Sequence, residues 1–295
     1  MNLTVLTPIY NRSEYIERMY ESLSGQTEKD FQWLVIDDGS RESSEEVFSD
    51  IAKKADFAVE YHYKENGGKH TALNFAHPYI KGEWVLILDS DDILTPDAVE
   101  TVRGYTEKYG GNEEIGIISF QRGTDTAHPL VKFPEAETVS DHITFRINEN
   151  RPGDCCEVLR ACVLKEYPFP VFENERFLVE THLWVRSAEK YKTAYIPKVI
   201  YLNEYREGGL TDSGHKMRRT CPKGGMYSQK ICLSRKFSLK FRIKRGILLN
   251  YYGKLAKKSA GEILKESGHP LFCGLLYIPA CLLYHYENRK YKKSG

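Results

Sequence analysis

Three carboxylates gather in one short segment of the sequence, Asp89 to Asp92 (DSDD). The apolar run before this segment, Trp84 to Leu88, is typical of a buried strand. Adjacent carboxylates repel one another unless a cation or hydrogen-bond donors compensate their charge. Mg²⁺ and Mn²⁺ prefer such oxygens and keep coordination positions for phosphate oxygens and water. The segment therefore predicts a divalent-metal site that also holds a diphosphate; the alternative is a helix N-cap at Asp92 and Thr95.

The segment Asp37 to Ser40 (DDGS) ends a second apolar run, Phe31 to Ile36. A carboxylate at this position can accept the N–H groups of a pyrimidine base edge, and Gly39 lets the chain turn tightly. An ordinary Asp-Gly turn is the competing interpretation, and for the segment taken alone it is the simpler one.

A glycine pair precedes a helical pattern in the segment Asn66 to Asn74 (NGGKHTALN). Backbone N–H groups at the start of a helix favour anions, and Lys69 adds a positive charge. The spacing and the residue after Lys69 differ from those of the phosphate loop of nucleotide-binding proteins. The segment therefore indicates either an anion contact or a flexible turn.

Alternating strands and helices must position these segments. Apolar runs predict strands at 3–7, 31–36, 59–63, 84–88 and 115–120, and helical patterns fall at 16–23, 43–54, 69–76 and 97–109. This alternation predicts an α/β protein with a mainly parallel sheet covered on both faces, whose ligands bind beyond the C-terminal ends of the strands. The pattern is irregular from 123 to 149, and apolar runs return at 177–184 and in a strand at 199–205. Three of the predicted strands end in polar residues, at Thr7 to Asn11, Asp37 to Ser40 and Asp89 to Asp92, and these three segments are expected to meet at one edge of the sheet.

The composition is that of an ordinary globular protein, with 295 residues of which 41% are hydrophobic and 28% charged. These proportions exclude a disordered chain and a fibrous repeat. The net charge of +1 hides an asymmetry: residues 216–295 hold 19 Lys and Arg against 3 Asp and Glu, and residues 1–215 hold the remaining 23 against 38. An acidic body with a basic end indicates a polyanionic partner or, equally, a solvated helical face.

The chain has 7 cysteines, an odd number, without the spacing of a zinc site. No signal peptide is recognisable at Met1, so we expect reduced thiols in the cytoplasm. No stretch reaches the roughly 18 apolar residues expected of a membrane span.

Four segments in this order resemble the family 2 glycosyltransferases of the GT-A fold: Thr7 to Arg12 (TPIYNR), Asp37 to Ser40, Asn66 to Asn74 and Leu88 to Asp92. The resemblance implies an inverting transferase that moves a sugar from a nucleoside diphosphate, usually UDP, to a glycan or lipid-linked acceptor in cell-surface polysaccharide biosynthesis. It implies Mn²⁺ or Mg²⁺ as cofactor. It covers a catalytic domain at residues 1–210, with a nucleotide-sugar half at 1–110 and an acceptor half at 111–210, followed by a basic helical extension at 211–295.

The resemblance also implies roles for single residues around the donor. Asp91 is expected to be the principal metal ligand, Asp89 to face the ribose or the donor sugar, and Asp92 to orient a loop or cap a helix. The residues expected to contact the nucleotide are Pro8, Tyr10 and Asp38 around the base, together with Asn11, Lys69, Asp89 and Ser90.

An inverting transferase also needs a base that deprotonates the acceptor hydroxyl. The family usually draws it from an acidic motif followed by Leu and Arg, which Glu180 to Arg186 (ETHLWVR) resembles. Glu180 is the expected base, although Val179 replaces the usual acidic neighbour. Glu173 and Glu175 are the alternatives.

Family members often carry a mobile loop that closes over the diphosphate, sometimes with a histidine on the metal. By the resemblance, Arg206 is expected at the nucleotide and His215 at the metal, both beside the turn at Gly208 and Gly209. A lone histidine is more often structural than a ligand, and this is the competing interpretation of His215.

The apolar run Leu271 to Tyr286 has basic neighbours, Lys265 before it and four Lys and Arg within 289–293 after it. Such a segment is suited to lie on an anionic leaflet, where each basic residue contributes about 1 kcal/mol. This indicates a peripheral position at the inner face of the plasma membrane and no nucleic-acid partner. The alternatives are a helical appendage packed on the catalytic domain and a contact between copies in a homo-oligomer.

Two other functions compete with glycosyl transfer. A nucleotidyltransferase also uses carboxylates, a metal and a nucleoside phosphate, but a Gly-rich N-terminal loop with basic residues is expected there, and Pro8 to Asn11 lacks it. A non-catalytic sugar-nucleotide-binding scaffold is the second alternative. The presence of both Asp91 and Glu180 argues against it.

Overall fold

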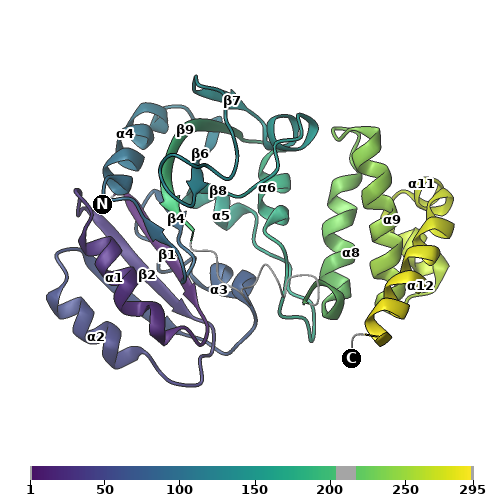
Figure 1. Cartoon of the computed structure of the whole chain (residues 1–295), viewed down its shortest axis with the longest axis horizontal. Helices are drawn as coiled ribbons and strands as arrows, with labels where there is room; N and C mark the ends of the chain where they lie inside the picture. The colour runs from purple at the N-terminus through teal and green to yellow at the C-terminus, as the bar shows by residue number, and fades with distance from the viewer. Residues whose placement is uncertain (1, 204–216, 294–295) are drawn as a thin grey trace. The chain divides into compact units, whose positions relative to one another are not determined.

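The computed structural model of the chain describes residues 2–203 and 217–293 (Figure 1). The chain divides into two compact units. The first contains the described residues of Met1–Phe169 and Arg186–Arg206, and the second those of Pro170–Val185 and Glu207–Gly295. The second unit thus includes a segment that precedes the last strand of the sheet.

Four parallel strands form the N-terminal half of the sheet in the first unit. They lie in the order β3 (Ala58–Tyr63), β2 (Phe31–Asp37), β1 (Leu3–Ile9) and β4 (Trp84–Ile87). The helices between them are α1 (Ile16–Ser24), α2 (Glu45–Lys54) and α3 (Lys69–Phe75), and the short turn η1 (Ser13–Tyr15) precedes α1. The predicted alternation of strands and helices is confirmed.

The other half of the sheet mixes strand directions. It continues from β4 with β8 (Cys155–Arg160), β6 (Ile115–Gly123), β9 (Lys192–Leu202) and β5 (Ile93–Leu94), and β7 (Thr138–Ser140) pairs with β9. β8 runs antiparallel to both β4 and β6, whereas β6 and β9 are parallel. The predicted strand at 199–205 is the end of β9, which begins at Lys192, and its last two residues lie outside the described ranges.

Helices also border this second half of the sheet. They are α4 (Ala98–Gly110), α5 (Ala161–Glu166) and a π-helical stretch, η2 (Ile143–Asn148). The stretch 123–149, irregular by its sequence pattern, thus contains both a short strand and a short helix. The helix α6 (Thr181–Ser187) crosses the boundary between the two units.

The core of the first unit follows from continuous apolar strands. β1, β2 and β4 are buried along their whole length, as expected of parallel strands with both faces covered. On α1 the residues at helical spacing, Ile16, Met19 and Leu23, are buried in the same cluster as Trp33 and Trp84. Each such side chain contributes about 2–3 kcal/mol through its removal from water. This core fixes the strand ends from which the polar segments project.

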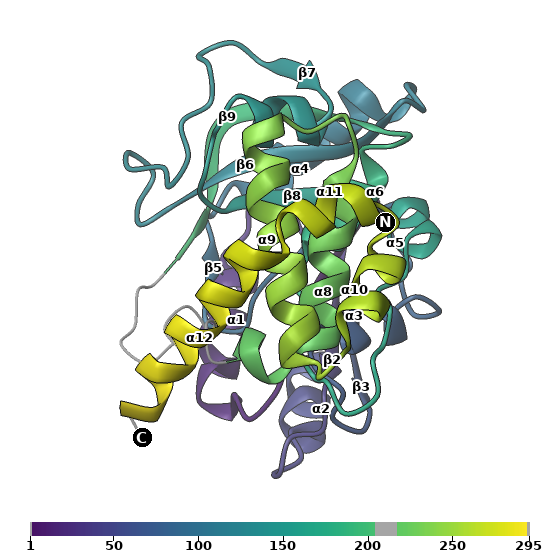
Figure 2. The ribbon, with the colours of Figure 1, turned by 90° about the vertical axis from the view of Figure 1, so that its right-hand side faces the viewer.

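The second unit is helical, as predicted for the basic end of the chain. It contains α8 (Pro222–Lys230), η3 (Ile231–Leu233), α9 (Leu239–Leu255), α10 (Ala260–Ser267), α11 (Pro270–Leu275) and α12 (Tyr277–Lys293). α9 lies against α8, α10, α11 and α12 (Figure 2). Leu249, Tyr252, Ile263 and Cys273 are members of its buried cluster.

The described residues contain neither a bilayer-spanning helix nor a disulfide. No helix within 2–203 or 217–293 combines the length and the apolar content needed to cross a bilayer. All 7 cysteines fall in these ranges, and none of them forms a disulfide.

Candidate functional site

The C-terminal ends of β1, β2 and β4 carry the three predicted polar segments of the first unit. The strands are parallel and in register, with Leu6 opposite Leu34 and Ile87, so the segments leave the sheet on the same edge. β6 ends close to this edge as well, because Arg122 near its end contacts Asp89 after β4. The structure therefore brings together side chains from four strands.

Asp89 lies between two cationic side chains. The Lys69 ammonium, at the first residue of α3, forms an ion pair with Oδ1 of Asp89, and Nη1 of Arg122 donates to Oδ2 over 3.2 Å. Burial acts to raise the pKa of this carboxyl, but the charges of Lys69 and Arg122 and their hydrogen bonds outweigh burial and hold the pKa well below its usual value. Asp89 is therefore a compensated anion without any metal.

Arg122 is a site residue that the sequence patterns did not predict. Its side chain is only 11% exposed, its Nε donates to the carbonyl oxygen of Cys155 over 2.6 Å, and its guanidinium lies 3.9 Å from the ring centroid of Tyr201. The hydroxyl of Tyr201 in turn accepts a hydrogen bond of 2.9 Å from the backbone N–H of Asp89. The one available signal was an arginine two positions after the predicted strand 115–120.

Asp92 is buried and already has partners within the protein. It is 5% exposed, and its Oδ2 accepts from Nδ2 of Asn203 over 3.1 Å and lies 3.7 Å from Nη1 of Arg122. Burial, with the neighbouring charges of Asp89 and Asp91, raises the pKa of Asp92 to about 7. This placement agrees with the expected role of orienting a loop.

The helix-cap interpretation of the acidic segment is wrong. α4 begins at Ala98 with Asp97 at its N-cap position, several residues after Asp92. The Thr95 hydroxyl donates to the Asp97 carboxylate over 2.8 Å and does not cap the helix. Asp92 instead connects the turn to the end of β9 through its hydrogen bond with Asn203.

Asp91 is the residue of this segment predicted to be the principal metal ligand. It lies in the turn between Asp89 and Asp92 and is partly exposed. Within the described ranges no group of three or more His, Cys, Asp or Glu side chains is arranged to hold a metal. Mg²⁺ is commonly held in proteins by one or two carboxylates together with phosphate oxygens and water, and a partly exposed carboxylate such as that of Asp91 is compatible with such a site.

The Asp38 carboxylate holds the glycine pair of the next loop. The backbone N–H groups of Gly67 and Gly68 donate to its two oxygens over 3.0 and 2.6 Å, and Nζ of Lys64 donates over 2.6 Å. The side chain is 4% exposed. Gly39 is required beside it, because its φ is 83° and an added Cβ would lie 2.5 Å from the backbone nitrogen of Asn66. In this structure Asp38 thus positions the loop that carries Lys69, and a base contact stays a prediction.

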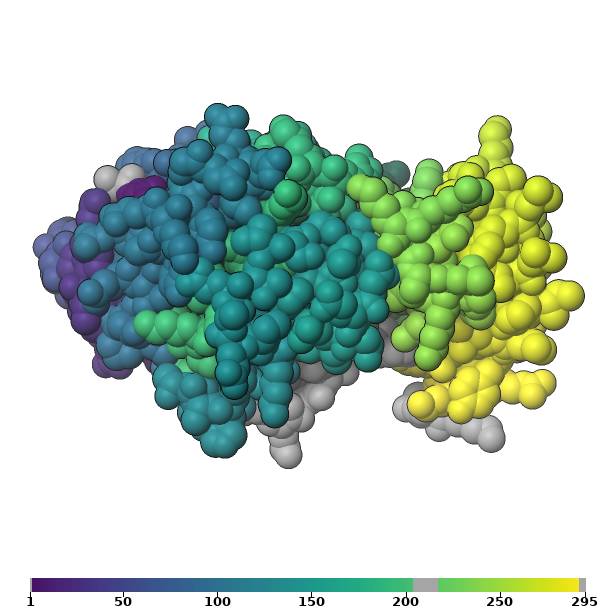
Figure 3. Space-filling view, turned by 90° about the horizontal axis from the view of Figure 1, so that it is seen from above, coloured from purple at the N-terminus to yellow at the C-terminus, as the bar shows by residue number. Residues whose placement is uncertain are grey.

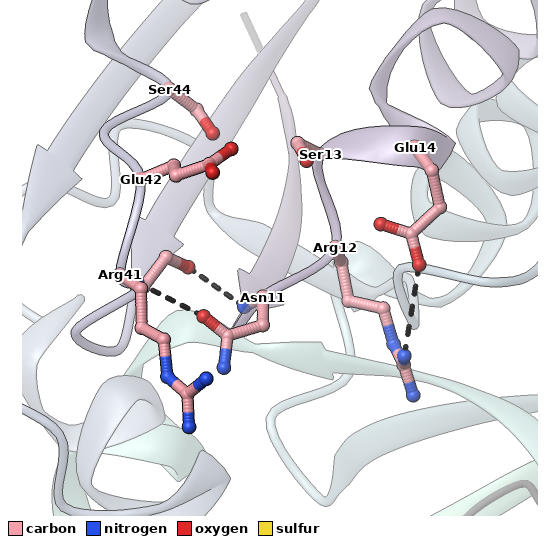
Figure 4. A pocket seen from close by; sticks show the side chains of 8 residues that line it. Asn11, Arg12, Ser13, Glu14, Arg41, Glu42 and Ser44 are labelled. Carbon is pink, nitrogen blue, oxygen red and sulfur yellow. Dashed lines mark hydrogen bonds and ion pairs between the residues drawn. The ribbon is translucent and has the colours of Figure 1, made fainter.

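The ends of β1 and β2 are joined by polar contacts. The backbone N–H of Asn11 donates to Oγ of Ser40 over 2.8 Å, and Oδ1 of Asn11 accepts from the N–H of Arg41 over 2.9 Å. These residues border a hollow of about 300 Å³ (Figure 4). Tyr10 is 44% exposed, whereas Pro8 is buried inside β1 opposite Ile36. Of the two, Tyr10 is the side chain available to a base.

Ser90, Arg206 and His215 are the remaining residues predicted to contact the nucleotide or the metal. Ser90 lies in the turn beside Asp91 and is partly exposed. Arg206 and His215 lie outside the described residues, so their expected roles stay predictions.

The glutamates named as candidate bases belong to the second unit. Glu180 lies in the turn directly before α6. Glu175 is 7% exposed, and its two oxygens accept the backbone N–H groups of Lys223 and Gly224, each over 2.7 Å. It thereby satisfies two of the free donors in the first turn of α8. Glu175 is consequently a helix cap, and Glu180 stays the predicted base.

Comparison with known proteins identifies the family. The profile of glycosyl transferase family 2 matches residues 4–156. An uncharacterized glycosyltransferase of Rickettsia felis is 36% identical over 212 residues, which are 72% of this chain and 34% of that protein. The chain therefore spans about a third of the length of this curated relative.

Two solved structures share the fold. S. aureus TarS 1–349 in complex with UDP-GlcNAc has a TM-score of 0.61 at 16% identity, covering 100% of this chain and 93% of that one. The mannosyltransferase PcManGT from Pyrobaculum calidifontis, in complex with GDP-Man and Mn²⁺, has a TM-score of 0.58 at 17% identity, covering 99% and 83%. The likeness supports the GT-A architecture expected from the sequence. With its family profile matched over more than half of its length, the chain belongs to glycosyl transferase family 2.

Proposed function

We propose that this chain transfers a sugar, with inversion, from a nucleoside diphosphate donor to a hydroxyl group of a glycan or lipid-linked acceptor in cell-surface polysaccharide biosynthesis. The observation that carries the proposal is the arrangement at the end of β4. Asp89 is compensated by Lys69 and Arg122, while Asp91 is left partly exposed beside them. Such a site offers both a carboxylate for a cation and cationic groups for a diphosphate.

The donor would bind along the edge that β1, β2 and β4 share. Tyr10, 44% exposed, presents a ring on which a base can stack. Asp38 holds the glycine loop and so fixes the start of α3, where Lys69 is the first residue. Lys69 pairs with Asp89 in this structure and can exchange this partner for a phosphate oxygen.

Asp91 would hold a divalent cation, Mn²⁺ or Mg²⁺. When bound, the cation neutralises the charge that develops on the leaving diphosphate. Arg122 keeps Asp89 ionised and in place, so that the Asp89 carboxylate can receive hydroxyl groups of the ribose or the donor sugar.

Glu180 would act as the base on the acceptor side. Its carboxylate takes the proton of the acceptor hydroxyl as that oxygen forms a bond to the anomeric carbon, and the bond from this carbon to the diphosphate oxygen breaks. This assignment rests on the resemblance of residues 180–186 to the family motif. The alternative at Glu175 is disfavoured, because both of its oxygens cap α8.

The two structural neighbours bind different nucleotides, UDP-GlcNAc in TarS and GDP-Man in PcManGT. UDP is the donor nucleotide that we propose here, since the family resemblance of the acidic segments implies it. The decisive experiment is calorimetric titration of the chain with UDP-GlcNAc and with GDP-mannose, each with Mn²⁺ and with excess chelator. We expect a UDP-sugar to bind, in a manner that depends on Mn²⁺.

Two variants separate the metal ligand from its neighbour. Asp91→Asn is expected to abolish the effect of Mn²⁺ on donor binding and to lower donor turnover by about a hundredfold or more. Asp92→Asn is the matched control, since an Asn oxygen can still accept from Asn203. If the affinity for the donor changes neither with the chelator nor in Asp91→Asn, the metal assignment is wrong.

A third variant tests the base. Glu180→Gln is expected to keep donor binding and to lose transfer to an acceptor, measured with a panel of glycan and lipid-linked acceptors. Unchanged transfer in Glu180→Gln would exclude Glu180 as the base. Tighter binding of a nucleoside triphosphate than of any nucleotide sugar would favour a nucleotidyltransferase, and binding without any turnover would favour a scaffold.

A further inference from the structure

One face of α11 and α12 is apolar and exposed. Leu271 is 87% exposed, Leu275 82%, Ile278 72%, Leu282 68% and Tyr286 65%. The spacing of these side chains, every three or four positions, places them on one side of a helical path. We call these residues the outer face.

The opposite side of α12 is apolar as well, and it is buried. Ala280 is fully buried, and Tyr277, Leu283 and Tyr284 pack against the cluster that includes Leu249 of α9. The inner side of α12 therefore packs against the buried core of its own unit. The outer face contributes nothing to that core, and a contiguous exposed apolar strip marks an interaction surface.

The position of the two helices leaves the outer face accessible within its unit. α11 and α12 lie over α9 on the side that faces the viewer in Figure 2, and the residues of α10 to α12 gather on one side of this unit in Figure 3. α12 is 17 residues long, and no helix in the described ranges can cross a bilayer. A helix that is too short to span a bilayer could meet one only by lying in the plane of its interface.

The charge of the surrounding sequence decides which environment fits. Residues 216–295 hold 19 Lys and Arg against 3 Asp and Glu, a surplus of 16 positive charges. Lys265, Arg289 and Lys290 are exposed and flank the outer face in the sequence. Two of the three acidic residues are engaged within the unit: Glu262 in the capping box of α10, and Glu266 with Lys258 over 2.7 Å.

Such a surplus favours an anionic partner over a second copy of the chain. Two copies that met through this face would bring two strongly cationic units together, which costs free energy at ordinary ionic strength. An anionic lipid surface offers both an apolar layer for the leucines and negative headgroups for the lysines and arginines. Tyr286 adds an aromatic ring of the type that settles at the headgroup level.

We propose that the outer face docks this chain on an anionic lipid bilayer, with α11 and α12 lying in the plane of the interface. Leu271, Leu275, Ile278 and Leu282 enter the acyl boundary, and Lys265, Arg289 and Lys290 contact headgroups. The docking requires neither donor nor metal, so it stands or falls independently of the proposed transferase activity.

The test is co-sedimentation of the full chain with vesicles. Vesicles of phosphatidylglycerol and phosphatidylcholine in equal parts are compared with vesicles of phosphatidylcholine alone, at low and at high salt. We expect binding to the anionic vesicles that weakens with salt, and little binding to the neutral ones. Equal binding to both kinds, or none to either, would overturn the proposal.

Variants assign the binding to the outer face. The pair Leu275→Gln and Leu282→Gln is expected to weaken vesicle binding by about tenfold or more, because two exposed apolar side chains are lost from the acyl boundary. The matched control is Val47→Gln with Val139→Gln, two exposed valines of the first unit at 45% and 46% exposure, which should bind as the native chain does. Arg289→Gln with Lys290→Gln should cost about fivefold per residue on anionic vesicles only.

Two further measurements keep the test decisive. Thermal unfolding must be unchanged in the leucine pair, which is expected since both positions are exposed and outside the core. Light scattering of the native chain without lipid is expected to show a single copy. A larger species that Leu275→Gln and Leu282→Gln return to one copy would assign the outer face to self-association and refute docking on lipid.

Discussion

Nη1 of Arg122 donates a hydrogen bond of 3.2 Å to Oδ2 of Asp89, a residue 33 positions earlier in the chain. The contact joins the end of β6 to the end of β4, two strands that are separated in the sheet by β8. The guanidinium is nearly buried and lies over the ring of Tyr201. Arg122 therefore connects the acidic segment to the second half of the sheet.

Replacing Arg122 should destabilise the protein through this contact. We expect Arg122→Met to lower the free energy of unfolding by about 2–4 kcal/mol, because Asp89 loses a buried counter-charge and the carbonyl of Cys155 loses its donor. Urea denaturation measures the change. Arg103→Met is the control: Arg103 pairs with Glu28 with its side chain 48% exposed, so the loss should stay below about 1 kcal/mol. Equal losses in the two variants would contradict the assignment.

The same contact can be tested for coupling. Asp89→Asn removes the charge that Arg122 compensates, so the double variant Asp89→Asn with Arg122→Met should cost less than the two single variants added together. We expect an interaction energy of about 1–3 kcal/mol from this double-mutant cycle, measured by urea denaturation. Additive losses would show that Arg122 stabilises the sheet only through Tyr201 and Cys155.

The strand ends could be predicted because continuous apolar runs mark buried parallel strands. β1, β2 and β4 have this pattern, and the segments Asp37 to Ser40 and Asp89 to Asp92 stand at the ends of two of them. The partners of these carboxylates could not be predicted in the same way. Arg122 and Lys64 are distant in sequence or stand in loops, and only the sheet order and its registers bring them to the site.

The division of the chain into two units could not be predicted from local sequence patterns either. Residues 170–185 precede β9 in sequence but belong to the unit of the C-terminal helices. One reason is Glu175, whose oxygens accept from Lys223 and Gly224 across 48 and 49 positions. Hydrogen bonds of this kind leave no periodic signal in a sequence, since one side chain caps a remote helix.

Asp38 should be important for stability as well as for donor binding. In Asp38→Ala the backbone N–H groups of Gly67 and Gly68, in a partly buried loop, lose their acceptor, so we expect a loss of about 2–4 kcal/mol in the free energy of unfolding. Since the same loop carries Lys69, donor affinity should fall about tenfold. Urea denaturation and calorimetry measure the two effects. Asp50→Ala, on an exposed residue, should leave the free energy of unfolding close to that of the native chain.

Substitutions at Glu175 should affect stability, whereas a substitution at Glu180 should affect catalysis. Glu175→Ala is expected to lower the free energy of unfolding by about 1–2 kcal/mol, because α8 loses the acceptor of its first-turn N–H groups. In Glu175→Gln one side-chain oxygen remains, and sugar transfer should persist while Glu180→Gln abolishes it. Thermal unfolding and an acceptor assay measure the two properties. Loss of transfer without loss of stability in Glu175→Gln would reverse the roles.

His70 should make the stability of the first unit sensitive to acid. It is 3% exposed, and burial, opposed by the charge of Asp38, lowers its pKa from the usual value near 6.5. As the pH falls below about 6.5 the unfolded chain takes up a proton that the folded chain does not, so the free energy of unfolding should fall by up to about 1.4 kcal/mol per pH unit until the folded pKa is reached. Urea denaturation at pH 7 and pH 5 checks this against His70→Gln, which should lose less on acidification. His269→Gln, on an exposed histidine of the second unit, should keep the native pH dependence, and a native slope in His70→Gln would assign the acid sensitivity to other groups.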